Sequence, residues 1–364
     1  MTKVLQILYS GLGGHGSVAF SLIEGDKNKR LDHRMLFYGI EELREEYQTK
    51  CIQYAVPFHS VKKKQGIDIG SYFKIYLALK RSTPDVILMH SVNLIVVGVF
   101  YRIFNNCKLV VVEHNANQIK RKSEWLWSLL SLVFASKVIY LTEKYKLEIK
   151  DTLSLFYREK KVEVIQNGIN LNKFKKTEKR SSEEINLVMQ SRFSPSSKDH
   201  ETLIYAFAGL KKKLSMKFKV KLILAGDGEN RKNMEELVQN LSLSKSVIFP
   251  GMLNEKALIE LLANTDIYVH SSIAETMSTA IMQALAFGLP IIATDIPGIN
   301  NMIEHKFNGL LFRPGDREGL LKLLVNLIEN KEERSTLKKN ARTYADEHLS
   351  SESMFNRYYS LLMN

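Results

Sequence analysis

Two cations, Arg192 and Lys198, lie six residues apart in a polar stretch that directly follows the apolar run 185–190. A guanidinium offers a planar fork of donors to phosphate oxygens, and an ammonium supplies a compact positive charge. Together they could neutralise a departing diphosphate. The alternative is that both are solvated surface cations.

A single carboxylate, Glu275, lies between the apolar run 267–270 and a segment whose spacing predicts a helix over 276–287. A helix that begins at Thr276 would place its free N–H groups beside this carboxylate. Those donors suit a phosphate, and the carboxylate suits sugar hydroxyls. Gln283 follows two turns later on nearly the same face. The alternative is that Glu275 caps its own helix.

A glycine loop and a histidine are the candidates in the first half of the chain. Residues 11–16 read Gly-Leu-Gly-Gly-His-Gly after a predicted strand, a pattern that lets backbone N–H groups approach phosphates. No acidic residue ends the second strand, which closes on Tyr38 and Gly39, so a nicotinamide enzyme is not favoured. His114 follows the apolar run 108–113 and is either a site residue or a structural histidine.

Several chemistries have no support in the sequence. The only cysteines are Cys51 and Cys107, and no Asp-x-Asp, His-Glu-x-x-His, Gly-x-Ser-x-Gly or Walker motif is present. We therefore expect no metal and no cofactor. The basic runs lack the interleaved aromatic residues of single-strand binders, so nucleic acid is not an expected partner.

Short apolar strands alternate with helices along the whole chain. This pattern predicts α/β structure with two doubly wound, Rossmann-like domains that face a central cleft. The expected domains are residues 1–166 and 185–349, joined by a polar linker at 167–184. The last helices are predicted over 318–329 and 331–363. A helix over 125–136 is expected to be a buried core helix, with an interfacial helix as the alternative.

Positive charge is concentrated in the first half of the chain. The net charge is +13, and residues 1–170 hold 25 lysines and arginines against 16 acidic residues. This excess indicates an anionic partner, such as membrane headgroups or a phosphorylated substrate, or reflects a lysine-rich composition. No segment reaches the roughly 18–20 apolar residues that span a bilayer, and the first residues do not resemble a signal peptide. We therefore expect a cytoplasmic protein.

Four segments, taken in this order, resemble the retaining GT-B glycosyltransferases of family 4, also described as glycosyl transferases group 1. They are Val164–Asn170, Leu222–Gly228, Val247–Gly251 and the run from Glu275 to Pro290. The resemblance implies that the donor diphosphate is bound by Arg192 and Lys198, and the donor sugar by Glu275. It places His114 near the reacting sugar carbon, and a terminal helix at about 350–364 back on the first domain.

Further donor contacts are implied by the same resemblance. They comprise the loop at Gly13 and Gly14, the strand end at Gly226, the base-contacting residues Gly251, Met252 and Leu253, and Thr276, Met277, Ser278 and Thr279 near the phosphates. One position departs from the family pattern. The second glutamate, which binds the ribose, is Gln283 here, and this exchange is expected to weaken nucleotide binding by about 1 kcal/mol or to alter donor preference. Pro297 and Asn301 also depart from the pattern.

The resemblance implies a retaining, metal-independent transfer of a hexose-type sugar from a nucleotide-diphosphate donor, with UDP expected. The acceptor is expected to be a saccharide, lipid-linked and reached at the inner membrane face, in cell-surface polysaccharide biosynthesis such as lipopolysaccharide or capsule. Two alternatives stay open: a nucleotide-sugar epimerase of the same fold, and a non-catalytic subunit that binds sugar nucleotides.

Overall fold

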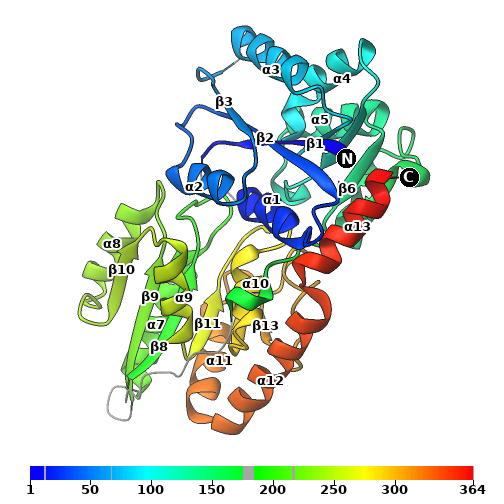
Figure 1. Cartoon of the computed structure of the whole chain (residues 1–364). Coiled ribbons are helices and arrows are strands. Elements are labelled where there is room, and N and C mark those ends of the chain that lie inside the picture. The colour runs from blue at the N-terminus through cyan, green and yellow to red at the C-terminus, as the bar shows by residue number, and fades with distance from the viewer. Residues whose placement is uncertain (12–13, 67, 175–183, 215–217, 364) are drawn as a thin grey trace. The chain divides into compact units, whose positions relative to one another are not determined.

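The computed structural model describes residues 1–11, 14–66, 68–174, 184–214 and 218–363, and it divides into two compact units. Unit 1 comprises residues 1–170 together with 350–364, and unit 2 comprises residues 171–349 (Figure 1). The polar segment 167–184 is thus shared between the units: Ile169 pairs with Ser350 in unit 1, and Leu171 begins unit 2.

Unit 1 is built on a seven-stranded parallel sheet in the order β3-β2-β1-β4-β5-β6-β7. The strands are β1 (Thr2–Tyr9), β2 (Leu31–Gly39), β3 (Phe58–Lys62), β4 (Val86–Met89), β5 (Lys108–Val112), β6 (Lys137–Tyr140) and β7 (Val162–Val164). Every residue of β4 is buried, because helices cover both faces of a doubly wound sheet. The chain order reverses between β1 and β4, so the loops after these strands border a switch point.

Seven helices within the described ranges cover this sheet. They are α1 (Gly14–Gly25), α2 (Glu45–Gln53), α3 (Ile69–Ser82), α4 (Ile95–Ile103), α5 (Lys122–Phe134), α6 (Glu143–Thr152) and α13 (Ser351–Met363). Helix α13 packs on α1, where Gly25 allows the close approach: a Cβ there would lie 2.2 Å from the Ser351 carbonyl oxygen. Right-handed crossovers place α4, α5 and α6 on the face opposite α1 and α2, and α3 packs beside α4.

Unit 2 repeats the architecture with six parallel strands in the order β10-β9-β8-β11-β12-β13. They are β8 (Glu184–Gln190), β9 (Lys219–Ala225), β10 (Val247–Gly251), β11 (Ile267–His270), β12 (Ile291–Thr294) and β13 (Leu310–Phe312). The covering helices are α7 (His200–Leu214), α8 (Arg231–Asn240), α9 (Glu255–Ala263), α10 (Thr279–Ala286), α11 (Arg317–Glu329) and α12 (Lys331–His348). Leu187, Phe207 and Leu324 lie in the fully buried core between this sheet and its helices.

The doubly wound prediction is confirmed, and three element predictions need correction. The helix expected from Thr276 begins at Thr279. The helix expected over 331–363 is two helices, because Leu349 ends α12 and Ser350 turns to pair with Ile169. The third concerns α5, which is not a buried core helix: Leu126 and Phe134 are exposed, and two of the three buried residues are serines.

Candidate functional site

The loops that follow β8 and β11 lie at the switch point of the unit 2 sheet, where the chain order reverses between neighbouring strands. They carry Lys198 and Glu275 respectively. The two loops are tied by backbone bonds: Ile273 donates to the Ser197 carbonyl at 2.9 Å and Asp199 to the Ser271 carbonyl at 3.1 Å. These bonds fix the two predicted site residues relative to each other.

The Glu275 carboxylate is the centre of this cluster. Its Oε1 atom accepts the Lys198 ammonium in an ion pair and lies 2.8 Å from His270 Nε2. Burial alone would raise the pKa of the Glu275 carboxyl, but the Lys198 charge and the His270 hydrogen bond outweigh it and lower that pKa to about 2. Glu275 therefore stays ionised, and it does not act as the cap of α10, whose N-cap residue is Ser278.

His270 is a site residue that the sequence reasoning missed. It is fully buried at the end of β11, and burial lowers its pKa against the opposing effect of Glu275. A neutral imidazole beside an ionised carboxylate must donate from Nε2, which leaves Nδ1 as an acceptor 3.4 Å from the Tyr268 hydroxyl. That hydroxyl also lies 3.3 Å from the Gln190 carbonyl oxygen. The only sequence signal is a histidine at the end of an otherwise apolar strand.

Arg192 differs from Lys198 in its surroundings. Its side chain is exposed, and within the described parts of the chain its guanidinium has no ion pair or hydrogen bond. The neighbouring Phe193 is buried and stacks on His200 with ring centroids 4.1 Å apart. Ser191 Oγ lies 2.8 Å from His200 Nε2. His200 thus holds the residues on both sides of Arg192 in place. The Arg192 guanidinium itself extends into solvent.

Two glycines allow the strand-end loops to approach each other closely. Gly226 has a φ of +132°, and a Cβ there would lie 1.9 Å from the Ser191 carbonyl oxygen. Gly298, in the loop after β12, abuts the peptide between Glu275 and Thr276, so that a Cβ would lie 2.0 Å from the Glu275 carbonyl oxygen. Only glycine fits at either position.

The remaining predicted donor contacts of unit 2 lie on two segments. Gly251, with a φ of +79°, ends β10, and its carbonyl accepts from Gly226 N at 2.9 Å; the exposed Met252 and the half-buried Leu253 follow it.

Thr276, Met277 and Ser278 form a loop rather than the first turn of α10, and Thr279 begins that helix. Glu275 is therefore not on the same helix as Gln283, which corrects the expectation of a shared face. The Gln283 Oε1 atom is buried and has no hydrogen-bond partner among the described residues.

In unit 1, His114 belongs to a line of three polar side chains that come from the interior of β1 and from the residues that follow β4 and β5. Its Nε2 lies 3.0 Å from Nδ1 of His90, and His90 Nε2 lies 3.0 Å from the buried amide oxygen of Gln6. Burial and His15 lower the pKa of His90 to about 3, and burial with His90 holds the pKa of His114 well below its usual range. Both imidazoles are therefore neutral.

A buried ion pair fixes the loop that carries His114. Lys120 Nζ lies 2.9 Å from Glu113 Oε2, and Ser128 Oγ donates to the same oxygen at 2.8 Å. Neither charged side chain of this pair is more than 3% exposed. From the sequence alone, Lys120 is only part of a basic run, and its pairing with Glu113, seven residues earlier, has no local signal in the sequence.

The glycine loop is described only in part. Gly13 lies outside the described residues, whereas Gly14 is exposed and begins α1. Two residues later, Gly16 packs on Tyr47, so that a Cβ at Gly16 would lie 2.1 Å from the tyrosine hydroxyl. This close contact with Tyr47 requires glycine at position 16 for helix packing.

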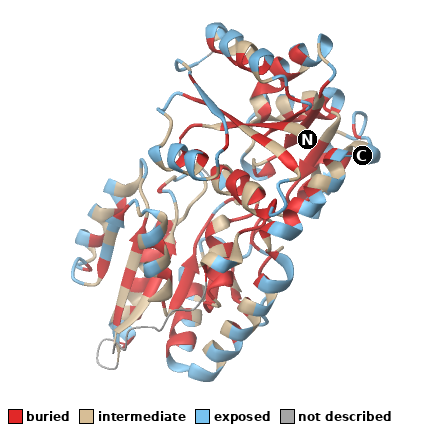
Figure 2. Cartoon of the chain, viewed as in Figure 1, coloured by how far each residue is buried: buried red, intermediate tan, exposed pale blue. Residues whose placement is uncertain are grey.

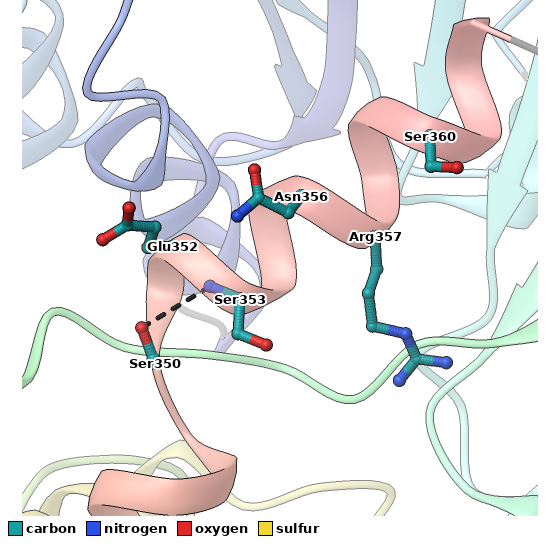
Figure 3. Close-up of a pocket in the computed structure, with 6 residues that line it drawn as sticks. All are labelled: Ser350, Glu352, Ser353, Asn356, Arg357 and Ser360. Carbon is teal, nitrogen blue, oxygen red and sulfur yellow. Dashed lines mark hydrogen bonds between the residues drawn. The ribbon is translucent and has the colours of Figure 1, made fainter.

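The described residues contain no group of three or more histidine, cysteine or acidic side chains placed to hold a metal ion. Within the same ranges, no helix is long and apolar enough to cross a bilayer. A hollow on the exposed side of α13 is lined by polar residues from successive turns, as Figure 3 shows: Ser350, Glu352, Ser353, Asn356, Arg357 and Ser360. None of these is a predicted site residue.

Two family models together match residues 12–344 of the chain. "Glycosyltransferase Family 4" matches residues 12–173, and "Glycosyl transferases group 1" matches residues 171–344. The chain belongs to the GT-B glycosyltransferases, and within them it is family 4-like.

Known proteins agree with this assignment. This glycosyltransferase is 27% identical to an uncharacterized glycosyltransferase of Methanocaldococcus jannaschii over 270 residues, which cover 70% of this chain and 68% of that protein. It is 32% identical to the alpha-monoglucosyldiacylglycerol synthase of Streptococcus pneumoniae over 177 residues, or 45% of this chain and 39% of the synthase. Anabaena HepE, solved in complex with UDP and glucose, shares the fold with a TM-score of 0.83, 21% identity and full coverage of both chains.

The family assignment makes the protein an enzyme that transfers glycosyl groups from a nucleotide-sugar donor. The model "Glycosyl transferases group 1" covers all of the strand-end loops described for unit 2, including those of Lys198 and Glu275.

Proposed function

We propose that this glycosyltransferase moves a hexose from a UDP-sugar to a lipid-linked saccharide with retention of anomeric configuration and without a metal ion. The observation that carries the donor half is the cluster of Lys198, Glu275 and His270 at the switch point, with Arg192 on the same loop as Lys198. Open parallel sheets bind ligands at such points.

Charge explains how this cluster would act on a diphosphate. The ionised Glu275 compensates Lys198 in the free enzyme, whereas Arg192 is exposed. A diphosphate bound here would meet the guanidinium fork first, and the Lys198 ammonium would reorient from Glu275 toward the phosphate oxygens. The Arg192 and Lys198 side chains would then stabilise the negative charge of the departing diphosphate. A metal ion has this role in other transferases.

Glu275 and His270 would then orient the donor sugar. Release of Lys198 to the phosphate leaves the Glu275 carboxylate with its bond from neutral His270, and the carboxylate can accept hydrogen bonds from sugar hydroxyls. In unit 1, His114 would face the reacting sugar carbon, held in one tautomer by His90 and Gln6. The UDP assignment draws support from Anabaena HepE, which was solved with UDP and glucose.

The acceptor half of the proposal rests on charge and on relatives. The excess of basic residues in the first half of the chain suits an anionic membrane surface. Two relatives have membrane or envelope products in their names: the synthase of Streptococcus pneumoniae, and a lipopolysaccharide core biosynthesis glycosyltransferase of Rhizobium meliloti, 29% identical over 143 residues. Building cell-surface polysaccharide at the inner membrane face is the role we propose.

The test is release of nucleoside diphosphate from UDP-sugars, first with water and then with saccharide acceptors. We expect Arg192→Ala and Lys198→Ala each to lower turnover by roughly 100-fold or more, and EDTA to have no effect. Lys232→Ala, at an exposed lysine of α8, is the matched control. Variant turnover within a few-fold of the parent would refute the proposal. Epimerised donor without nucleotide release would indicate an epimerase, and donor binding without any release a non-catalytic subunit.

A further inference from the structure

Six large apolar side chains are exposed together on two adjacent helices of unit 1. They are 51–77% exposed and comprise Ile69 and Phe73 on α3, Val96, Phe100 and Ile103 on α4, and Phe104 directly after α4. We name this set the α3–α4 face. Single exposed apolar residues are ordinary, but a contiguous set of this size marks a surface that meets a partner.

Ring contacts join the two helices into one surface. Tyr76 of α3 lies 5.3 Å from Phe100 between ring centroids, and Phe100 lies 5.4 Å from Phe104. Figure 2 shows outward stretches of α3 and α4 in the colour of exposed residues, with the buried residues turned toward the sheet. The surface continues toward α5, where Arg102 donates to the carbonyl of the exposed Phe134 at 2.9 Å.

The charges around this face have one sign. Residues 51–112 contain eight lysines and arginines but only two acidic residues, Asp68 and Asp85. Asp68 is engaged in capping α3 through Ser71 N, and Asp85 accepts from Lys3 N at 2.8 Å. The exposed Lys74, Lys80 and Arg81 stand on α3 itself, and Arg102 stands on α4.

This combination selects among the possible occupants. A second copy of the chain would bring like charges together around the apolar centre, which opposes self-association. A nucleic acid would satisfy the cations but leave the aliphatic and phenyl groups in water. An anionic bilayer satisfies both, because apolar side chains enter the acyl boundary while the long cationic side chains reach the headgroups.

We propose that the α3–α4 face docks this enzyme on the surface of an anionic lipid bilayer. The proposal deepens the proposed function and rests on it only for the acceptor that the bilayer would carry. Helix α4 begins six residues after Met89, at the strand end that also leads to His90, so the face starts at the same edge of the sheet as His90 and His114. Docking there would hold this edge close to lipid-linked saccharides.

Flotation with liposomes tests the proposal without donor or acceptor. The intact chain is mixed at low salt with vesicles of phosphatidylglycerol and phosphatidylcholine, or of phosphatidylcholine alone. We expect binding to the anionic vesicles only, and a loss of binding in high salt. The double variant Phe100→Ser/Phe104→Ser should bind roughly tenfold more weakly, and Lys80→Glu/Arg81→Glu should show the same direction.

The matched control is Ile52→Ser/Leu155→Ser, which removes two apolar side chains of unit 1 that are 74% and 75% exposed but lie outside the face. It should bind vesicles as the parent does. Thermal unfolding with UDP establishes that every variant is folded and tests the donor site separately. The proposal is overturned if the parent binds no anionic vesicle, if the control loses as much binding as the face variants, or if the face variants instead dissociate a dimer.

Discussion

A single oxygen of Glu275 lies 2.8 Å from Nε2 of His270 and also accepts the ammonium of Lys198. The carboxylate thus lies between the neutral imidazole of His270 and the ammonium of Lys198. When Lys198 moves to a phosphate, the carboxylate keeps its hydrogen bond from His270. This arrangement is the physical basis for the donor chemistry that we propose.

Removal of the Lys198 charge should destabilise the fold, because the buried Glu275 carboxylate then lacks a compensating charge. The pKa of Glu275 is lowered from 4.5 to about 2, so its contribution to folding stability is complete above pH 4.5 and is lost as the pH falls toward 2. We expect Lys198→Met to lower the free energy of unfolding at pH 7 by about 3 kcal/mol.

Chemical denaturation of the full chain measures this loss. Lys198→Met/Glu275→Gln is the matched comparison, because it removes both charges and should recover most of the stability. The difference between the parent and Lys198→Met should narrow as the pH falls through the pKa of the variant's Glu275 carboxyl toward 2, because a protonated carboxyl no longer needs the lysine charge. An equal loss in the single and double variants would show that the pair does not compensate charge.

A methyl group at Gly298 should displace the backbone that carries Glu275. A Cβ there would lie 2.0 Å from the Glu275 carbonyl oxygen, so Gly298→Ala must displace the Glu275–Thr276 peptide. We expect a loss of about 1–3 kcal/mol in the free energy of unfolding and weaker nucleotide binding. Gly70→Ala, in the first turn of α3 with only an ordinary contact at 3.4 Å, is the control and should change neither quantity by much.

Restoring a glutamate at position 283 should have opposite effects on the free and the bound enzyme. The Gln283 Oε1 atom is buried and has no hydrogen-bond partner in the part of the chain that the structure describes, so a charge there costs stability until a ligand donates to it. We expect Gln283→Glu to unfold at a lower temperature when free but to bind a nucleoside diphosphate about 1 kcal/mol more tightly. Calorimetric titration reads the second effect, and unchanged or weaker binding would remove position 283 from the ribose site.

The proton position on His114 should depend on Gln6. The Gln6 oxygen accepts from Nε2 of His90, so Nδ1 of His90 accepts and His114 donates from Nε2. Imidazole ¹⁵N shifts should show a protonated Nε2 on His114 in the parent and a tautomer mixture in Gln6→Met. Ser131→Ala, which removes another buried hydrogen bond of unit 1, should leave the shifts unchanged. If the ¹⁵N shifts of His114 were the same in Gln6→Met and in the parent, Gln6 would not set the proton position on His114.

The sequence predicted the fold where hydrophobic periodicity was unambiguous. The apolar runs 85–90 and 267–270 predict strands, and the spacing over 69–81 and 255–263 predicts helices. The structure places β4, β11, α3 and α9 within a residue or two of these bounds. The sequence did not predict α4, because an apolar run without a polar face is equally compatible with a buried strand. Strand β3 was also missed, since only one of its five residues is buried and no alternation marks an edge strand.

The candidate site, like the fold, could be predicted only in part. Strand-end loops after β8 and β11 follow from topology, and their charged residues could be read from the sequence. The residues that position these charged groups could not be predicted from the sequence. Gln6, His90 and His270 lie within or directly after buried strands, where a single polar residue usually has no functional role. Contacts between residues distant in sequence, such as Gln6 with His90, require the folded sheet.

Thermal unfolding with UDP, GDP, ADP and NAD is the measurement that tests the donor site most directly. A nucleoside diphosphate at 100 times its dissociation constant should add about 2.7 kcal/mol of stability. We predict this shift with UDP in the parent and in Lys232→Ala, and its loss in Arg192→Ala and Lys198→Ala. A full UDP shift in both cation variants, or a shift with NAD alone, would contradict the account.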